Sequence, residues 1–182
     1  MINFDNIEYL KTGNSRQKKA YTVLSKNLVI ESLQEFDPIL VGTIPINIDI
    51  ENSDLDIICC WKDRNYFVES IIRLFAGKQG FSIKNDESQN CVIASFTIDQ
   101  LKIEIFGQNI PVRMQMGYRH MLIEHHLLLE HGPIFREKII ELKKQGYKTE
   151  PAFALLLGLQ GNPYEALLKY ELLQTATNSI IK

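Results

Sequence analysis

Residues 41–57, VGTIPINIDIENSDLDI, contain the pattern that decides both the fold and the chemistry. Gly42-Thr43 ends a short β-like run, and ten residues later Asp54-Leu55-Asp56 begins a second run rich in β-forming residues. Positions i and i+2 of a strand point to the same face, so we expect the two aspartates side by side, about 7 Å apart at Cα. The apolar residues between and after them point the other way, into a core.

A third carboxylate lies in a similar frame, Lys102-Ile103-Glu104-Ile105-Phe106. Glu104 opposes its apolar neighbours, so on a strand next to Asp54 and Asp56 it would complete a cluster of three acids. Such a cluster repels itself unless cations occupy it. Because ligands that are all oxygen favour hard ions, we expect Mg²⁺ or Mn²⁺. The alternative is that Asp54 forms a turn with Ser53 and that Asp56 and Glu104 are charges at strand edges.

The residues around these acids predict an α+β fold, with a small mixed β-sheet flanked by helices. The pattern predicts a helix from a Ser15 cap to about Phe36, and a second from an Asp63 cap to Phe75. Asp99-Gln100 is a plausible two-residue hairpin turn between the last two strands. We expect the strands over residues 39–41, 55–61, 81–84, 91–98 and 101–106.

The last third of the chain is expected to be helical, in segments that begin near residues 114, 133, 149 and 163. We therefore predict a core over residues 1–113 and a helical region over 114–182. The candidate linker, 107–113, is short, so we expect the helical region to pack on the core as one compact unit. The residues that need burial there are Met121, Leu122, Leu128 and Leu129.

Composition narrows the class of protein. The chain has 182 residues, with 20 basic and 22 acidic side chains and a net charge of -2. A protein that grips duplex DNA usually carries a basic excess, so duplex DNA is disfavoured as a partner. The start lacks the basic segment of a signal peptide, and no apolar run approaches the ~20 residues of a membrane span. We expect no membrane association.

The cysteines point to a reducing compartment. There are three, with no Cys-x-x-Cys spacing, which fits free thiols in the cytoplasm. Cys59 and Cys60 lie in an apolar run and are expected to be buried. His120 and Glu124 could share a metal ion, but no second ligand pair has zinc-site spacing, so we expect ordinary groups on a helix surface.

The order of these motifs resembles the polymerase β-type nucleotidyltransferase superfamily. The residues that carry the resemblance are Val41-Gly42-Thr43, Ser53-Asp54-Leu55-Asp56-Ile57 and Ile103-Glu104-Ile105. The longer strings GTIPINIDIENSDLDII, RHMLIEHHLL and KTEPAFA resemble a bacterial family within it, known as domain of unknown function 4269. The likeness covers nearly the whole chain. Two departures are Thr43, where the superfamily usually has Ser, and Glu104, where Asp is commoner.

The resemblance implies a nucleotidyltransferase core and metal-dependent transfer of a nucleoside monophosphate from a nucleoside triphosphate to a hydroxyl acceptor. One ion on Asp54, Asp56 and Glu104 would lower the pKa of the acceptor, and another on the two aspartates would bind the triphosphate. Glu104 would be the general base. The residues that would contact phosphate are Gly42, Thr43 and Ser53, and those that could reach the triphosphate or an anionic acceptor are Arg113 and Arg119.

The acceptor is left open between a small molecule, a protein and a tRNA end. A second hypothesis, from a different class, is a non-catalytic nucleotide-binding or toxin–antitoxin-type interaction protein on the same fold. The intact set of three acids favours transfer. A glycosyltransferase with a metal-binding Asp-x-Asp needs a nucleotide-sugar domain of about 100 residues, more than the roughly 50 that precede Asp54.

Overall fold

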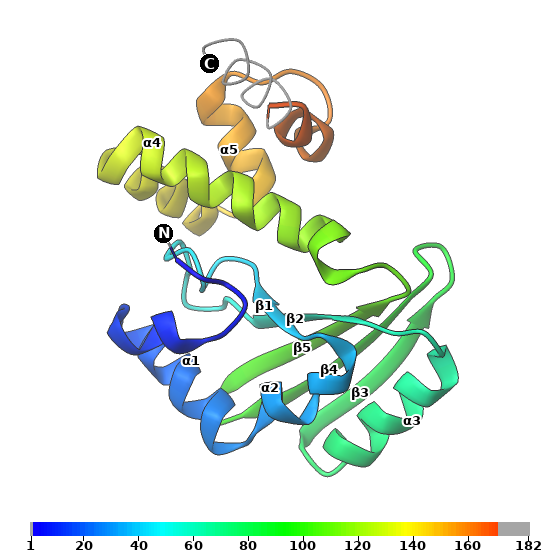
Figure 1. The fold of residues 1–182 in the computed structure, drawn as a ribbon. Coiled ribbons are helices and arrows are strands. Elements are labelled where there is room, and N and C mark those ends of the chain that lie inside the picture. Colours follow the sequence, from blue (N-terminus) through cyan, green and yellow to red (C-terminus); the bar gives the residue numbers. More distant parts are fainter. Residues whose placement is uncertain (1, 171–182) are drawn as a thin grey trace. The chain divides into compact units, whose positions relative to one another are not determined.

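The computed structural model describes residues 2–170 of the chain. They form two compact units (Figure 1). The first contains the described residues up to Asn47 together with Asn52–Tyr118, and the second contains Ile48–Glu51 and the described residues from Arg119 onward. The chain thus enters the second unit briefly between the Gly-Thr pair and the Asp-x-Asp pair. The packing of residues 114–182 on the core stays a prediction.

The first unit is built on a five-stranded mixed sheet with the order β1-β2-β5-β4-β3. β2 and β5 run parallel, while the other neighbouring pairs are antiparallel. This confirms the α+β class and the mixed sheet. The strands are β1 (Ile39–Val41), β2 (Leu55–Cys60), β3 (Gln79–Asp86), β4 (Cys91–Ile98) and β5 (Leu101–Gln108).

The predicted hairpin between β4 and β5 is confirmed. Asp99 and Gln100 both have positive φ, 47° and 66°, which matches a two-residue turn whose twist suits the flanking strands. Ser95 pairs with Glu104 in the resulting ladder. The hairpin therefore sets which residues of β5 face each side of the sheet.

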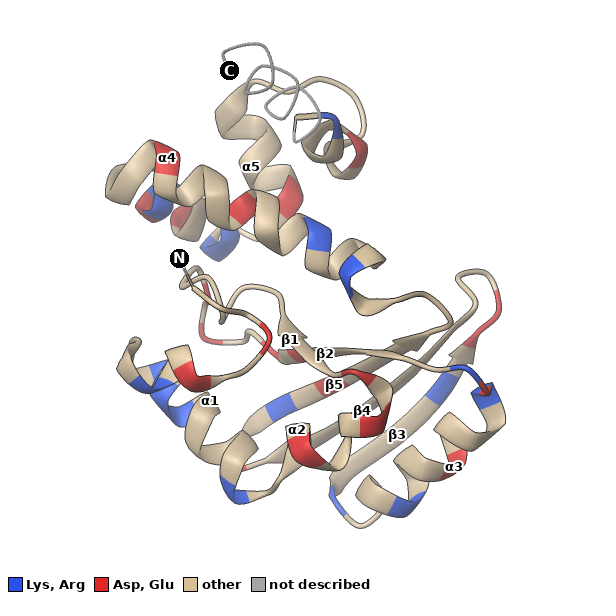
Figure 2. Ribbon diagram, in the orientation of Figure 1, with Lys and Arg blue, Asp and Glu red and all other residues tan. Residues whose placement is uncertain are grey.

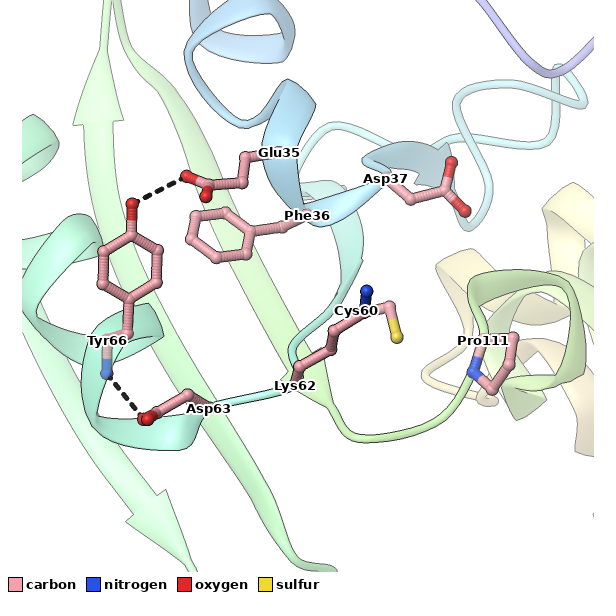
Figure 3. A pocket seen from close by; sticks show the side chains of 8 residues that line it. All are labelled: Glu35, Phe36, Asp37, Cys60, Lys62, Asp63, Tyr66 and Pro111. Carbon is pink, nitrogen blue, oxygen red and sulfur yellow. Dashed lines mark hydrogen bonds between the residues drawn. The ribbon is translucent and has the colours of Figure 1, made fainter.

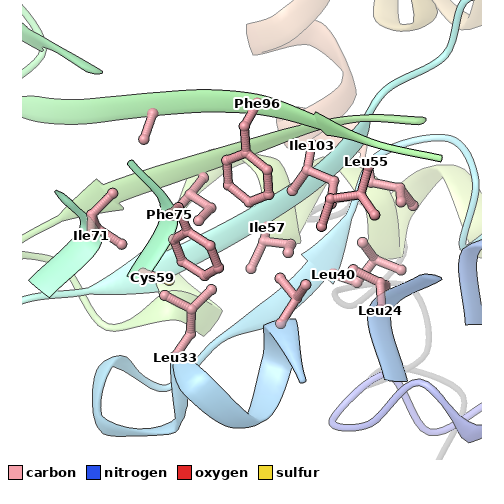
Figure 4. Close-up of a cluster of buried hydrophobic side chains, with 14 of the residues drawn as sticks. Leu24, Leu33, Leu40, Leu55, Ile57, Cys59, Ile71, Phe75, Phe96 and Ile103 are labelled. Carbon is pink, nitrogen blue, oxygen red and sulfur yellow. The ribbon is translucent and has the colours of Figure 1, made fainter. Parts of the chain in front are cut away.

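One face of the sheet packs against helices and forms the core (Figure 4). α1 (Ser15–Lys26) and α3 (Arg64–Phe75) supply buried side chains to it. Phe75 stacks on Phe96 of β4 with ring centroids 4.7 Å apart. Ile57 and Ile103 lie in the same cluster. By strand alternation, Asp56 and Glu104 project from the opposite face.

The predicted helix from Ser15 to Phe36 is wrong in its length and its cap. α1 ends at Lys26, because Leu28 takes a left-handed conformation with φ 51°. Leu28, which helical spacing would place with Ala20 and Leu24 on an apolar face, is 58% exposed. Asn14 is the cap: its side chain accepts from the backbone N–H of Gln17, whose side chain accepts from that of Asn14. The remaining short helices are η1 (Glu8–Thr12), α2 (Val29–Ser32), η2 (Gln34–Phe36) and η3 (Val112–Met114).

Other helix boundaries agree with the sequence. Asp63 caps α3 by accepting from the N–H of Tyr66 at 3.0 Å. α4 (Met116–Lys144) is interrupted at Gly132, where φ is 77°, between the two predicted helices. α5 spans Thr149–Leu157, and residues 163–170 are helical after Asn162, which accepts from the N–H of Tyr164 at 3.0 Å.

Burial of the apolar residues in the second unit agrees only in part with the sequence prediction. Met121 and Leu128 are buried, as expected, but Leu129 is 62% exposed. Across residues 2–170, no helix combines the length and apolarity needed to cross a bilayer.

Candidate functional site

The parallel pairing of β2 and β5 brings the predicted acids together. Asp56 and Glu104 are register partners across the two strands. Asp54 comes just before β2, two residues from Asp56, and therefore lies toward the same face. The side chains of Asp54 and Glu104 are 30% and 35% exposed, so both reach solvent. The prediction that Glu104 lies on a strand beside the two aspartates is confirmed.

Gly42 lies against this cluster from the other side of β2. Val41 at the end of β1 pairs with Asp56, and Gly42 follows with φ 82°. A Cβ at Gly42 would lie 2.6 Å from Oδ2 of Asp56, too close for any side chain unless the carboxylate moved. The absence of a side chain thus permits both the turn and the close approach of the backbone to Asp56.

The two predicted hydroxyl groups also meet. Thr43 Oγ1 donates to Ser53 Oγ at 3.3 Å, which joins the residue after the glycine to the residue before the Asp-x-Asp pair. Arg16 of α1 donates from Nη2 to the backbone carbonyl of Ser53 at 2.6 Å. The contact joins residues that are 37 positions apart in the sequence.

Side chains at the start of α1 hold the segment that follows Gly42-Thr43. Gln17, only 6% exposed, donates from Nε2 to the carbonyls of Ile44 and Pro45 at 2.8 and 3.2 Å. Asn14 donates to the side chain of Asn47 at 2.6 Å. Through these contacts, the side chains of Asn14 and Gln17 fix the segment after Gly42-Thr43. The one sequence signal for them is a polar Gln on the buried side of α1.

Lys102 lies among the acids, on the same face of β5 as Glu104. Its Nζ is 2.6 Å from Oδ2 of Asp54 and 3.9 Å from Oε2 of Glu104. The hydrogen bond to Asp54, and then the charges of Asp54, Glu104 and Asp56, raise the pKa of the Lys102 ammonium. Both signs of charge along β5 are visible in Figure 2.

The donor set suits a hard divalent ion, because Asp54, Asp56 and Glu104 offer only oxygen. The Asp56 carboxylate is also held against bare backbone at Gly42. Yet, within residues 2–170, no three acid, histidine or cysteine side chains already surround one point that could hold a metal. Asp54 is engaged by Lys102 instead. The chemistry of these ligands suits Mg²⁺ or Mn²⁺, and binding of either ion here stays a prediction.

Neither of the two arginines predicted to contact phosphate or an acceptor is part of the acid cluster. Arg113 donates to Asp5 at 2.6 Å and also pairs with Asp37 at 3.7 Å, just before β1 begins. Gly42 follows the opposite end of β1. Arg119 belongs to the second unit. Phosphate or acceptor contact by either arginine stays a prediction.

The expectation that His120 and Glu124 lie on a helix surface is wrong. They are 5% and 3% exposed. His120 Nε2 is 3.1 Å from the carbonyl of Tyr164, and its Nδ1 is 3.5 Å from Glu150. Burial, with a contribution from Glu150, raises the pKa of the Glu124 carboxyl well above its ordinary value, while Lys143 opposes the rise.

A cavity of about 350 Å³ lies at the other ends of β1 and β2, seen in Figure 3. Tyr66 donates to Glu35 at 2.9 Å across its wall. Cys60 lines it and is half-buried, whereas Cys59 is fully buried, so the expected burial holds for Cys59 alone. The cavity shares no residue with the acid cluster. The wall is formed by Glu35, Phe36, Asp37, Cys60, Lys62, Asp63, Tyr66 and Pro111.

The fold is shared with solved structures of low sequence identity. Cid1, described for its RNA terminal uridylyl transferase activity, is 11% identical with a TM-score of 0.55 over 72% of this chain and 41% of that chain. The Cid1 poly(U) polymerase with Mg 3′-dATP bound is 14% identical, with a TM-score of 0.53 over 71% of this chain and 41% of that chain. The polymerase core of TRAMP, an RNA surveillance complex, is 12% identical, with a TM-score of 0.52 over 88% of this chain and 50% of that chain.

This chain spans half the length or less of each of these structures. At such identities the likeness shows the fold alone, which is shared with Cid1 and the TRAMP polymerase core. No match was found among curated proteins. The family model of a domain of unknown function, DUF4269, matches residues 22–170, a span that includes the glycine turn and all three acids. The chain therefore belongs to the DUF4269 family.

Proposed function

We propose that this protein is a nucleotidyltransferase, which moves a nucleoside monophosphate from a nucleoside triphosphate to a hydroxyl acceptor and releases pyrophosphate. The observation that carries the proposal is the register pairing of Asp56 with Glu104 beside Gly42, on a nucleotidyltransferase fold. Carboxylates gathered on one face of a sheet favour bound cations, and this supports a cation-dependent task.

Asp54, Asp56 and Glu104 would hold Mg²⁺ or Mn²⁺. When bound, the metal would neutralise triphosphate charge and lower the pKa of the acceptor hydroxyl. One of the similar structures, the Cid1 poly(U) polymerase with Mg 3′-dATP bound, supports this pairing of ion and nucleotide.

The remaining roles fall to groups on the chain itself. The backbone at Gly42 and the hydroxyls of Thr43 and Ser53, whose oxygens are 3.3 Å apart, would contact the phosphates. Arg16 would position Ser53, and Gln17 the segment after Thr43. Glu104, held between buried Ile103 and Ile105, accepts the proton of the acceptor hydroxyl.

The test is incubation with each labelled nucleoside triphosphate, Mg²⁺ or Mn²⁺ and a cell extract, followed by tracking of the label into small molecules, protein and tRNA. Asp54→Asn and Asp56→Asn should abolish labelling. The matched control is Asp99→Asn in the β4–β5 turn, where positive φ also suits Asn, and it should label normally.

Labelling that survives in both cluster variants would show that the activity does not belong to this site. Metal-dependent triphosphate binding without transfer to any acceptor would instead support the non-catalytic nucleotide-binding hypothesis, the competing function on the same fold.

A further inference from the structure

Lys102 occupies the position of a cation in the acid cluster. Its ammonium lies 2.6 Å from Asp54 and 3.9 Å from Glu104, the first a charge-assisted hydrogen bond and the second an ion pair. Lys102 and Glu104 are at i and i+2 on β5, so strand alternation fixes both side chains on the face that carries Asp56. The position of the lysine is therefore set by the sheet and not by chance contact of surface chains.

Two further observations separate this contact from an ordinary surface ion pair. The ammonium lies within ion-pair distance of two of the three acids, Asp54 and Glu104, and not of Asp54 alone. In residues 2–170, no three possible ligands yet surround a metal position, while Asp54 is bound to the lysine. A divalent ion that binds Oδ2 of Asp54 would replace this contact.

We infer that Lys102 is an exchangeable internal counter-ion, which stabilises the three carboxylates until a divalent cation displaces it from Asp54. The inference rests on the proposed function, because it assigns a regulator of cation binding to the same site. Its side chain is 49% exposed, so the ammonium can leave Asp54 without disturbing the core. The lysine thus lowers the affinity for the ion alone and keeps the cluster from repelling itself when no ion is bound.

The experiment measures Mn²⁺ binding to the full chain without nucleotide, by the loss of the free Mn²⁺ paramagnetic resonance signal. Lys102→Met keeps the apolar length of the side chain and removes its charge. It should tighten Mn²⁺ binding about three- to twentyfold, the scale for removal of one like charge a few Å from a divalent ion near solvent. Lys102→Arg keeps the charge and should stay within about threefold of the wild type.

Lys84→Met is the matched control, because Lys84 lies on β3 and, by register through Ile93 and Phe106, on the same face of the sheet. It changes the net charge equally but at a distance, and should alter Mn²⁺ affinity less than twofold. A second readout is the rise of melting temperature with added Mn²⁺, which should be larger for Lys102→Met than for the wild type.

Mn²⁺ affinity of Lys102→Met within twofold of the wild type, or an equal gain in Lys84→Met, would overturn the inference. Failure of the proposed function looks different. In that case neither the wild type nor Lys102→Met would bind Mn²⁺, alone or with a triphosphate, in a way that Asp54→Asn weakens.

Discussion

Substitution of Gly42 by Ala should damage the site far more than the fold. The added Cβ would lie 2.6 Å from Oδ2 of Asp56, against an ordinary contact of at least 3.4 Å, so the carboxylate oxygen must retreat by about 0.8 Å. The next atoms of Asp56 are already at 3.6 and 3.7 Å and need not move. The carboxylate can therefore rotate away at small cost in stability, but it is the group that would hold the ion.

Gly80→Ala is the control that isolates this contact. Gly80 has φ 67°, close to the 82° of Gly42, but nothing lies within 4 Å of its added Cβ. Both variants should lose about 1–2 kcal/mol from left-handed backbone strain. At about 2–4 °C per kcal/mol for a chain of this length, both should melt several degrees below the wild type and close to each other.

Titration calorimetry with Mn²⁺ and a non-hydrolysable triphosphate then separates the two. Gly42→Ala should bind at least about tenfold more weakly than the wild type, because a displacement approaching 1 Å exceeds the tolerance of a positioned ligand. Gly80→Ala should bind within twofold of the wild type. Wild-type binding by Gly42→Ala, with the expected fall in melting temperature, would refute the reasoning that the glycine exists to admit the Asp56 carboxylate.

Three further predictions follow from other parts of the molecule. Glu104→Gln should cut turnover by about 10²-fold or more while apparent triphosphate affinity changes less than about tenfold, as measured by transfer kinetics; the reverse split would reassign its role. Gln17→Ala removes two buried hydrogen bonds and should cost about 1–3 kcal/mol in urea unfolding, against under about 0.5 for exposed Thr22→Ala. Glu124 keeps its proton in the folded state above the pH at which the unfolded chain loses it, so wild-type stability should fall as pH rises beyond about 4.5, by at most ~1.4 kcal/mol per unit. Glu124→Gln should remove that fall in pH-dependent denaturation, and parallel curves would contradict the raised pKa.

The parts of the fold that follow from local periodicity could be read from the sequence. Alternation over residues 91–98 and 101–106 locates β4 and β5, and the turn between them needs only two residues that tolerate positive φ. The break after α1 could not be read this way. The apolar spacing continues through Leu28 and gives no sign of the left-handed conformation that this residue adopts.

The burial of His120 and Glu124 escaped the sequence for a related reason. A charged or polar residue on a helix is usually exposed, and helical periodicity alone gives no sign of a partner from a distant segment. Here the carbonyl of Tyr164 and the side chain of Glu150 come from later elements of the second unit. A polar network of this kind becomes visible only when the helices are packed.

The candidate site shows the same division between local and distant information. Strand alternation alone places Lys102 and Glu104 on one face, so the sequence contains the signal that a cation neighbours the third acid. It does not contain the contact with Asp54, which lies 48 residues away and depends on β2 pairing parallel to β5 with Asp56 opposite Glu104. A shift of that pairing by one residue would turn the acids of one strand away from those of the other. The register that assembles the proposed metal ligands is therefore the same register that delivers the ammonium that competes for them.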